Sequence, residues 1–332
     1  MSKQYNVYGI GNALVDVQYQ VDDDYLKRME VEKGGMTLVD EPRQLALSDA
    51  VDGDPLQRTS GGSAANTMIM VSGFGGTSYY GCKVGTDEAG DFYLNDLSEA
   101  GVESNQQNRG EGVTGTCLVL ITPDGERSMN TFLGITSTFG PEQVDTDIIA
   151  NSDVVYIEGY LLSSESGVEA ALKAQSEAHA TGVKVALTLS DGFIIDVFRE
   201  PLETVLKGGV DLLFANESEA KTYTDRDSVG TACSALGKVV GDYVVTLGGD
   251  GAVVSDKGNV REVKGHTVEV IDTNGAGDAF AGAFLFGITN GYSNSDAAKL
   301  ANFAGAQVVS KLGARLDRRL EGEIATILGS PQ

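Results

Sequence analysis

Seven consecutive residues carry the strongest signal in this chain: Asp272-Thr273-Asn274-Gly275-Ala276-Gly277-Asp278. They follow an apolar run at 267–271 that predicts a β-strand, and they open an alanine-rich segment at 279–286 that predicts a buried helix. Unpaired N–H groups at the start of such a helix, together with the helix dipole, form a site for an anion. The pattern therefore predicts an anion-binding turn between a strand and a helix.

Asp278 falls inside this predicted anion site. A carboxylate beside a place built for negative charge is explained if it takes a proton from a hydroxyl group. The backbone N–H groups of residues 275–277 would then hold a transferring phosphoryl group. A tight turn in which Asp272 or Asn274 caps the helix is the purely structural alternative.

The complete string D-T-x-G-A-G-D resembles the second signature of the ribokinase-like (PfkB) carbohydrate kinases. The resemblance implies an α/β fold in which a doubly wound, mostly parallel sheet is flanked by helices and carries a small β-strand lid. It implies ATP-dependent phosphorylation, with Asp278 as general base and the backbone of residues 275–277 stabilising the transferred group. It also implies Mg²⁺, nucleotide contacts from Asp272 and Thr273, and a monovalent cation, K⁺, near Asp272 and Asn274.

The composition of the 332-residue chain is that of a globular protein, with 41% hydrophobic and 22% charged residues. Its net charge of −24 argues against nucleic acids and anionic membranes as partners, and no apolar run reaches the length that spans a bilayer. Three cysteines at unrelated spacings, Cys82, Cys117 and Cys233, suit reduced thiols in a cytoplasm. We therefore expect a cytoplasmic protein that acts on small molecules, either as a monomer or as a homodimer.

Apolar, β-branched runs alternate with helix-like stretches such as 167–180 and 228–240. The runs are Asn6–Gly11, Cys117–Ile121, Val154–Ile157, Val183–Leu189, Leu212–Ala215 and Tyr243–Leu247. The alternation predicts one α/β domain, residues 1–332, whose ligands lie beyond the carboxyl ends of parallel strands. Two segments, approximately 15–58 and 108–133, break the alternation with strands and turns, and the second predicts a hairpin. In the resembling family such segments form the lid over the sugar site.

A second constellation, Gly61-Gly62-Ser63-Ala64-Ala65-Asn66, precedes a predicted helix. Paired glycines let a ligand approach the backbone closely, and Asn66 can both donate to and accept from vicinal hydroxyl groups. A glycine turn capped by Ser63 is the structural alternative. The G-G-S-x-x-N pattern is similar to that of adenosine-kinase-like members of the family, which implies that this stretch binds the substrate.

The first predicted strand ends in Gly11-Asn12-Ala13-Leu14-Val15-Asp16. Asp16 is an acceptor suited to a ribose diol, although a surface aspartate at the lid hinge would look the same in the sequence. The pattern G-N-x-L-x-D is again similar to adenosine kinases, and the resemblance implies that Asn12 and Asp16 bind the sugar. Leu14 stands where a dinucleotide-binding fingerprint needs its third glycine, and the Walker pattern of P-loop kinases is absent.

Two further strand ends carry candidate nucleotide and metal contacts. Asn216 and Glu219 form N-x-x-E, which resembles the magnesium motif of the family, and a hard cation takes oxygen ligands, often through its own waters. The same spacing also makes a helix capping box. The resemblance implies that Thr246 and Gly248 contact ATP, with a plain β-turn as the alternative. It places Asn302 near the nucleotide too, unless that residue is merely polar on a helix surface.

Arg127 follows the turn of the predicted lid hairpin. Arginine is well suited to clamping a phosphate, and its E-R-S context resembles a phosphate-contacting arginine in adenosine kinases. A surface ion pair with Glu126 or Asp124 is the alternative.

A nucleoside site also needs an apolar shelf for a flat base. Met36, Met129, Leu133 and Tyr160 are the candidates, and the ring of Tyr160 can stack on a base, although each residue could equally pack in a core or lid. We therefore predict ATP-dependent phosphorylation of the 5′-hydroxyl of a nucleoside, with adenosine favoured. A sugar kinase acting on ribose or fructose is the alternative, and a non-catalytic nucleotide or sugar sensor is the next.

Overall fold

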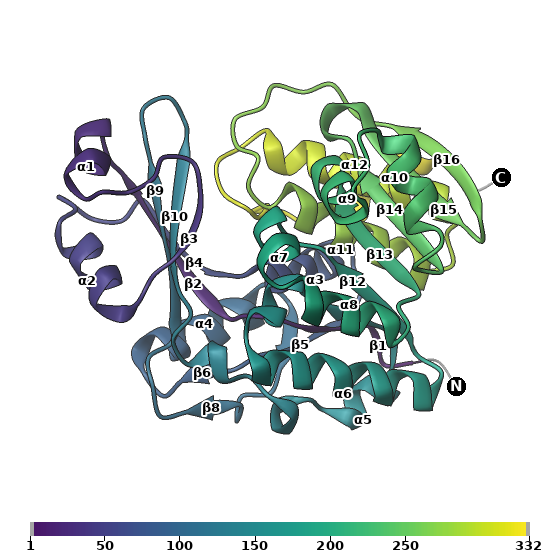
Figure 1. Ribbon diagram of the computed structural model, residues 1–332, viewed down its shortest axis with the longest axis horizontal. Coiled ribbons are helices and arrows are strands. Elements are labelled where there is room, and N and C mark those ends of the chain that lie inside the picture. The colour runs from purple at the N-terminus through teal and green to yellow at the C-terminus, as the bar shows by residue number, and fades with distance from the viewer. Residues whose placement is uncertain (1–2, 330–332) are drawn as a thin grey trace.

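The computed structural model describes residues 3–329, and a nine-stranded sheet forms its centre (Figure 1). The strands, in spatial order, are β16 (Asn259–Lys264), β15 (Gly251–Asp256), β14 (Asp242–Thr246), β13 (Leu212–Asn216), β12 (Lys184–Thr188), β11 (Ser152–Ile157), β1 (Tyr5–Ile10), β5 (Ser78–Gly81) and β7 (Val102–Ser104). All neighbours from β14 to β7 run parallel, and only β15 and β16 pair antiparallel. The predicted mostly parallel sheet is therefore confirmed.

Helices cover both faces of this sheet, because successive side chains of a strand point to opposite faces. In β1, Val7 joins one hydrophobic cluster and Tyr8 the other, and in β14 Val244 and Val245 divide in the same way. The helices are α3 (Ser63–Gly73), α4 (Glu88–Glu99), α5 (Thr146–Ala150), α6 (Glu165–Thr181), α7 (Gly192–Val197), α8 (Arg199–Lys207), α9 (Glu217–Thr224), α10 (Val229–Leu236), α11 (Ala276–Thr289), α12 (Asn294–Val309) and α13 (Ile324–Leu328). Short 3₁₀ helices are η1 (Gly134–Thr138), η2 (Pro141–Gln143), η3 (Gly159–Ser163), η4 (Gly248–Asp250) and η5 (Glu321–Glu323). The fold is thus doubly wound, as predicted.

A second sheet stands beside the first as a lid, at the left of Figure 1. Its strands, in spatial order, are β3 (Gly35–Leu38), β10 (Arg127–Phe132), β9 (Gly115–Ile121), β2 (Leu14–Gln20) and β4 (Gln57–Gly61). The predicted hairpin is present, since β9 and β10 pair antiparallel with Arg127 opposite Ile121. A small two-stranded sheet, β6 (Val84–Gly85) with β8 (Arg109–Gly110), lies outside both sheets.

Two helices in the lid correct the prediction of strands and turns alone for 15–58. They are α1 (Asp23–Arg28) and α2 (Glu41–Asp49), and each begins after an aspartate, Asp22 or Asp40, that accepts a hydrogen bond from the first turn. They cover one face of the lid sheet, where Leu118 and other apolar side chains pack between them. The opposite face of the lid sheet is turned toward the central sheet and contributes to the cavity described below.

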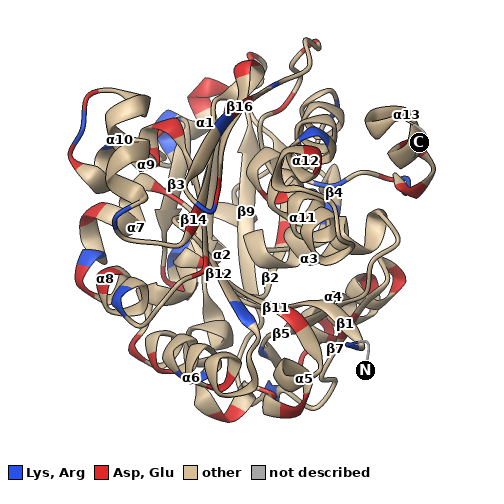
Figure 2. Cartoon of the chain, turned by 90° about the vertical axis from the view of Figure 1, so that its right-hand side faces the viewer, with Lys and Arg blue, Asp and Glu red and all other residues tan. Residues whose placement is uncertain are grey.

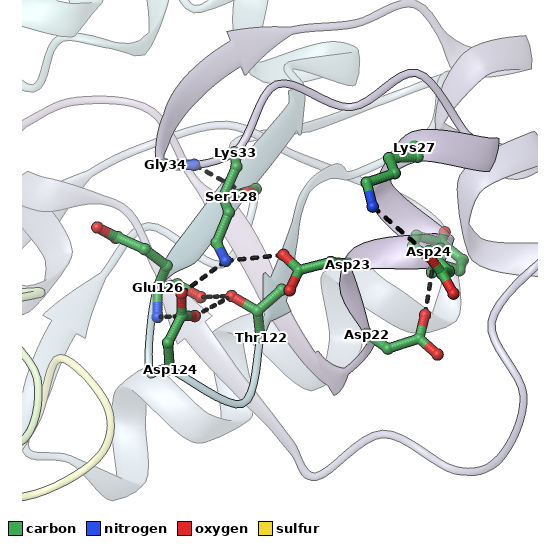
Figure 3. Close-up of polar contacts among 11 residues, drawn as sticks. Asp22, Asp23, Asp24, Lys27, Lys33, Gly34, Thr122, Asp124, Glu126 and Ser128 are labelled. Carbon is green, nitrogen blue, oxygen red and sulfur yellow. Dashed lines mark hydrogen bonds and ion pairs between the residues drawn. The ribbon is translucent and has the colours of Figure 1, made fainter.

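Lys33 ties α1 to the turn of the lid hairpin (Figure 3). Its ammonium group lies 2.8 Å from a carboxylate oxygen of Asp23 and 2.6 Å from one of Asp124. Thr122 donates a further hydrogen bond to Asp124 at 2.6 Å, which shapes the turn. Exposed ion pairs of this kind contribute little stability singly, so their effect is to fix the position of the hairpin turn within the lid.

The predicted strand at 267–271 is wrong. These residues form no ladder with β16 or with any other strand of the described chain. Val270 and Ile271 are 59% and 51% exposed, and the Ile271 N–H donates to the carbonyl of Val309 at the end of α12. The segment is extended and β-branched like a strand, but the sheet already ends at β16.

Acidic side chains are spread over the helices and loops of the surface rather than gathered into one block (Figure 2). Cys82, Cys117 and Cys233 are all buried free thiols. Between residues 3 and 329, no helix combines the length and the apolar character needed to cross a bilayer.

Candidate active site

The start of α11 is an uncapped helix mouth. Gly275 precedes the helix with a φ of 74°, and no side chain within residues 3–329 accepts a hydrogen bond at this N-terminus. A Cβ atom on Gly275 would lie 2.4 Å from the carbonyl oxygen of Ala314, so only glycine fits. The structural alternative, a helix capped by Asp272 or Asn274, is therefore wrong. The Ala276 N–H donates to the Thr273 carbonyl at 3.3 Å, while the N–H groups of Gly277 and Asp278 have no hydrogen-bond partner among the described residues and remain available for an anion.

Asp278 lies in the first turn of α11 and is held by two residues of the G-G-S-x-x-N stretch. Ser63 Oγ donates to one of its carboxylate oxygens at 2.6 Å, and Asn66 Nδ2 donates to the other at 3.0 Å. Loss of solvent raises the pKa of Asp278 to about 6, against the lowering effect of both hydrogen bonds. The carboxylate is thus ionised at neutral pH and still basic enough to share a proton.

The two glycines before Ser63 bring backbone segments into close contact. A Cβ atom on Gly61 would lie 2.2 Å from the Asp16 carboxyl carbon, and one on Gly62 would lie 2.2 Å from the Asn12 carbonyl oxygen. Gly62 also has a φ of 97°. The absence of a side chain at Gly61 and Gly62 therefore makes room for Asp16 and Asn12 of the protein itself.

A cavity of about 830 Å³ lies between the lid and the carboxyl ends of the central strands. It collects nearly all the predicted substrate residues, together with the helix mouth and the metal candidate; only Gly61 stands just behind the wall. The predicted residues that line it are Asn12, Asp16, Met36, Gly62, Ser63, Asn66, Arg127, Met129, Leu133, Tyr160, Asn216, Glu219, Asp272, Thr273, Gly275, Gly277 and Asp278.

A second cavity of about 510 Å³ adjoins the first. Its wall includes the predicted nucleotide residues Thr246, Gly248, Thr273 and Asn302, together with Ala276. The two cavities share Val270, Thr273 and Gly277 in their walls, so they meet at the mouth of α11. An elongated ligand lying through both would place its middle at the anion site.

Asn302 is not the surface residue that the alternative supposed. It is buried on α12, and its Nδ2 donates to the carbonyls of Val263 and Lys264, at 3.1 Å each. These bonds hold the end of β16 against α12 and shape the second cavity.

Glu219 forms the capping box and also lies in the cavity wall, and its role as a magnesium residue stays a prediction. It forms the capping box with Asn216, whose backbone N–H and side-chain amide donate to the two carboxylate oxygens at 3.0 Å and 2.6 Å. It also lines the large cavity, and burial raises its pKa to about 7. Within residues 3–329 no group of three His, Cys, Asp or Glu side chains could enclose a metal ion. A lone carboxylate of this kind fits a cation that keeps its waters, as Mg²⁺ does.

Arg127 does not pair with Glu126 or Asp124, which corrects the surface-ion-pair alternative. Its Nη2 lies 2.5 Å from Oδ2 of Asp272, and the two side chains are 9% and 2% exposed. Neither terminal nitrogen of Arg127 makes a well-directed hydrogen bond to the described protein atoms. Both terminal nitrogens are buried, and the Arg127 side chain forms part of the cavity wall.

Asp16 is another charged group on the lid side of the cavity, whose wall also includes Asp124 and Glu126. Burial raises its pKa to about 7, while the positive charges of Arg315 and Arg127 act in the opposite direction. Arg315 itself is anchored by Asp96, with 2.8 Å between nitrogen and carboxylate oxygen. Within residues 3–329 Asp16 makes no ion pair, so its oxygens can accept from a hydroxyl group.

Sequence reasoning missed Glu158, which follows β11 directly. One of its carboxylate oxygens accepts from the Ala64 N–H at 2.9 Å, at the beginning of α3. Burial raises the pKa of Glu158 to about 8. The signal that could have found it is a carboxylate placed immediately after the apolar end, Val154–Ile157, of a parallel strand.

The loop after β12 was missed as well. Ser190 has a φ of 67°, unusual for a residue with a side chain, and its hydroxyl accepts from the Gly159 N–H at 2.9 Å. The next residue, Asp191, caps α7 and lies 3.4 Å from the hydroxyl of Tyr160. Phe193 of α7 lines the large cavity beside them. A Ser-Asp-Gly sequence at a strand end was the available signal.

Comparison with known proteins agrees with this geometry. Residues 36–319 match the model of the pfkB family carbohydrate kinases, a span that includes the helix mouth and Asp278. The chain belongs to this family. The kinase is accordingly an ATP-dependent phosphotransferase with an alcohol group as acceptor.

Relatives of known name extend over nearly the whole kinase. It is 31% identical to adenosine kinase from Saccharomyces cerevisiae over 326 residues, covering 92% of this chain and 94% of that one. The structure of adenosine kinase from Sinorhizobium meliloti is similar with a TM-score of 0.91 at 35% identity, covering 97% and 99% of the two chains. A probable sugar kinase from Rhizobium etli gives a TM-score of 0.92, also at 35% identity, covering 99% and 100%.

Proposed function

We propose that this kinase transfers the γ-phosphoryl group of ATP to the 5′-hydroxyl of a nucleoside, with adenosine as the favoured acceptor. The observation that carries the proposal is the set of residues that line the large cavity, which has a volume of about 830 Å³. Its wall contains hydroxyl-binding groups as well as the apolar side chains of Met36, Met129, Leu133 and Tyr160, which would supply the shelf for a base. A free pentose would leave most of that shelf unused, whereas a purine fills it.

Asp278 is the general base in this proposal. Its carboxylate, fixed by Ser63 and Asn66, takes the proton of the acceptor hydroxyl as that oxygen attacks the phosphorus. The first-turn N–H groups of α11 that have no partner in the described chain stabilise the negative charge on the phosphoryl oxygens, and the Ala276 N–H, which donates to Thr273, would turn to join them. Base and anion site are therefore one residue apart on the same helical turn, which fixes their relative position.

The sugar lies between β1 and the beginning of α3. Asp16 accepts hydrogen bonds from its hydroxyl groups, and Asn12 both accepts and donates, because both residues line the cavity beside Asp278. Arg127 approaches from the lid and supplies guanidinium donors to the phosphate chain. Closure of the lid over the acceptor excludes water, which limits hydrolysis of ATP.

The nucleotide occupies the second cavity, with Thr246, Gly248 and the region shaped by Asn302 around it. Mg²⁺ neutralises charge on the phosphates when it is bound. Glu219 is the residue that would hold its water shell from the protein side. We place the reaction in the cytoplasm, in keeping with three buried free thiols.

Sugar phosphorylation is the second candidate function, because a probable sugar kinase is among the most similar structures. A panel of adenosine, other nucleosides, ribose and fructose, each at the same ATP concentration, separates the two. We expect turnover with adenosine. Robust turnover with ribose or fructose and none with any nucleoside would reject our choice.

A non-catalytic sensor is the third candidate, and release of ADP tests it directly. The sensor requires that no acceptor in the panel stimulate ADP formation. An intact Asp278 at an open helix mouth favours catalysis instead.

A further inference from the structure

The Asp272 carboxylate is surrounded by donors. Its Oδ1 accepts from the Asn274 N–H at 3.0 Å, and its Oδ2 accepts from the Gly313 N–H at 2.7 Å. In addition, Arg127 Nη2 lies 2.5 Å from Oδ2, and the Asp272 side chain is 2% exposed. Each of the two oxygens therefore already faces at least one positively polarised hydrogen.

A monovalent cation does not fit this arrangement. An alkali ion requires oxygen atoms whose lone pairs point at it without an intervening proton. At Asp272 a backbone N–H group points at each carboxylate oxygen, and the guanidinium of Arg127 forms an ion pair with Oδ2. The family resemblance implied a K⁺ site near Asp272 and Asn274. In this structure the negative charge of the Asp272 carboxylate is already balanced by Arg127 and the two N–H groups.

We propose that Arg127 serves as the built-in cation of the loop at 272–275, so that this kinase works without a monovalent metal ion. The guanidinium takes over the electrostatic task that an alkali ion would perform at Asp272. The inference rests on the proposed phosphoryl transfer only for its activity measurement, since the charge balance at Asp272 is a property of the protein alone.

The loop is held on its other sides by the chain that follows α12. The N–H groups of Ile271 and Asp272 donate to the carbonyl of Val309, at 2.7 Å and 3.2 Å. Gly313 is part of the same connection, and Ala314 packs against Gly275. Arg127 is the contact that comes from the lid, so the positive charge at Asp272 depends on the position of β10. Arg127 is in this respect a positioning residue for the helix mouth.

The test compares wild type with Arg127→Met, Arg127→Lys and a matched control. The control is Arg109→Met, because Arg109 also pairs with an aspartate, Asp91 at 2.6 Å, but on the surface. Each protein is measured in KCl, NaCl, LiCl and choline chloride at equal ionic strength. The readouts are Tm without nucleotide and ADP release with saturating adenosine, ATP and Mg²⁺.

For wild type, and likewise for Arg109→Met, we expect neither Tm nor turnover to change from one salt to another. Arg127→Met should have a lower Tm and lower turnover in choline chloride, and an alkali cation should restore part of both. Arg127→Lys keeps the charge and should remain insensitive to the choice of salt.

Two results would overturn the inference. One is a wild-type enzyme that loses turnover or Tm when K⁺ is replaced by choline. The other is an Arg127→Met protein whose Tm, like that of wild type, is the same in all four salts. Removal of the guanidinium would then not have created a position that an alkali cation can occupy. A failure of the proposed function is separate, since no ADP would form in any salt while the Tm comparison still decides the role of Arg127.

Discussion

Ser63 and Asp278, 215 positions apart in the chain, meet through a hydrogen bond of 2.6 Å from hydroxyl to carboxylate. The contact joins the beginning of α3 to the beginning of α11, and the two helices pack against each other. It also sets the chemistry of Asp278. Burial raises the pKa of this carboxyl group, and the Ser63 donor pulls it back, which leaves it at about 6.

Asp278→Asn should lower kcat by roughly 10²–10⁴-fold, because an amide cannot accept the proton of the acceptor hydroxyl. Asparagine keeps an acceptor for Ser63, so we expect a Tm close to that of wild type. Steady-state ADP release measures the loss. Asp196→Asn, at an exposed position of α7, is the matched control and should retain full activity. Unchanged turnover in Asp278→Asn would remove the general base from the mechanism.

The pH profile of kcat/KM should fall below about pH 6, since protonation of Asp278 removes the base. Ser63→Ala takes away a hydrogen bond that stabilises the ionised carboxylate, and the acidic limb should therefore move to higher pH. Initial rates between about pH 4 and pH 8, roughly two units on either side of that pKa, give the limb directly. A limb that stays in place in Ser63→Ala would assign it to another group, for which Glu219 and Asp16 are the candidates.

Glu158 should make the protein less stable as pH rises. Its pKa is about 8 in the folded protein and near 4.5 in a solvated chain, so the folded state holds a proton that the unfolded state has lost. The stability from this proton is full below pH 4.5 and disappears as pH passes 8. Glu158→Gln cannot titrate and should flatten the dependence between these values, by up to about 1.4 kcal/mol per pH unit. Urea unfolding at a series of pH values tests this, and an unaltered slope in the variant would contradict it.

Much of this site was predictable because short local patterns determine it. The glycines and Asp278 at the mouth of α11 form one contiguous motif, and strands that alternate with helices bring its neighbours to the same edge of the sheet. The capping box of Asn216 and Glu219 is likewise encoded within four residues. Such features depend on neighbours in the sequence and need no knowledge of distant contacts.

The predictions that were wrong depended on distant partners. The run at 267–271 has the composition of a strand, yet whether it pairs is decided by the position of the sheet edge and by Val309. The partner of Arg127 could not be read from its own neighbours, because Asp272 is 145 positions away and the two meet only when the lid packs. Glu158 was overlooked because its buried partner, the Ala64 N–H, belongs to another segment.

Tyr160→Ala should raise the KM for adenosine while leaving the KM for ATP unchanged. The ring lines the acceptor cavity but not the second one, so it can contact only the acceptor. Loss of stacking costs about 0.5–1.5 kcal/mol, which corresponds to roughly a two- to tenfold rise in KM. Tyr292→Ala, which removes an exposed ring, is the control. An unaltered KM for adenosine would dissociate Tyr160 from the base.

Substitutions at Gly275 and Gly277 distinguish the effect of the helix mouth on folding from its effect on catalysis. A Cβ atom on Gly275 would collide with the backbone of Ala314, so Gly275→Ala should lower Tm together with activity. A Cβ atom on Gly277 meets no protein atom within 4 Å, and the residue lies inside α11, where alanine is favoured over glycine by up to about 1 kcal/mol.

Gly277→Ala should therefore keep or raise Tm, yet its methyl group enters the space that joins the two cavities. If that space holds the transferring phosphoryl group, kcat/KM for ATP should drop by at least about tenfold, or 1.4 kcal/mol in transition-state stabilisation. Gly230→Ala in α10 is the matched control, because its Cβ also meets nothing within 4 Å but the residue belongs to neither cavity wall. Wild-type kinetics in a well-folded Gly277→Ala enzyme would mean that the phosphoryl group passes elsewhere, since a methyl group and phosphoryl oxygens cannot share the same few cubic ångströms at the mouth of α11.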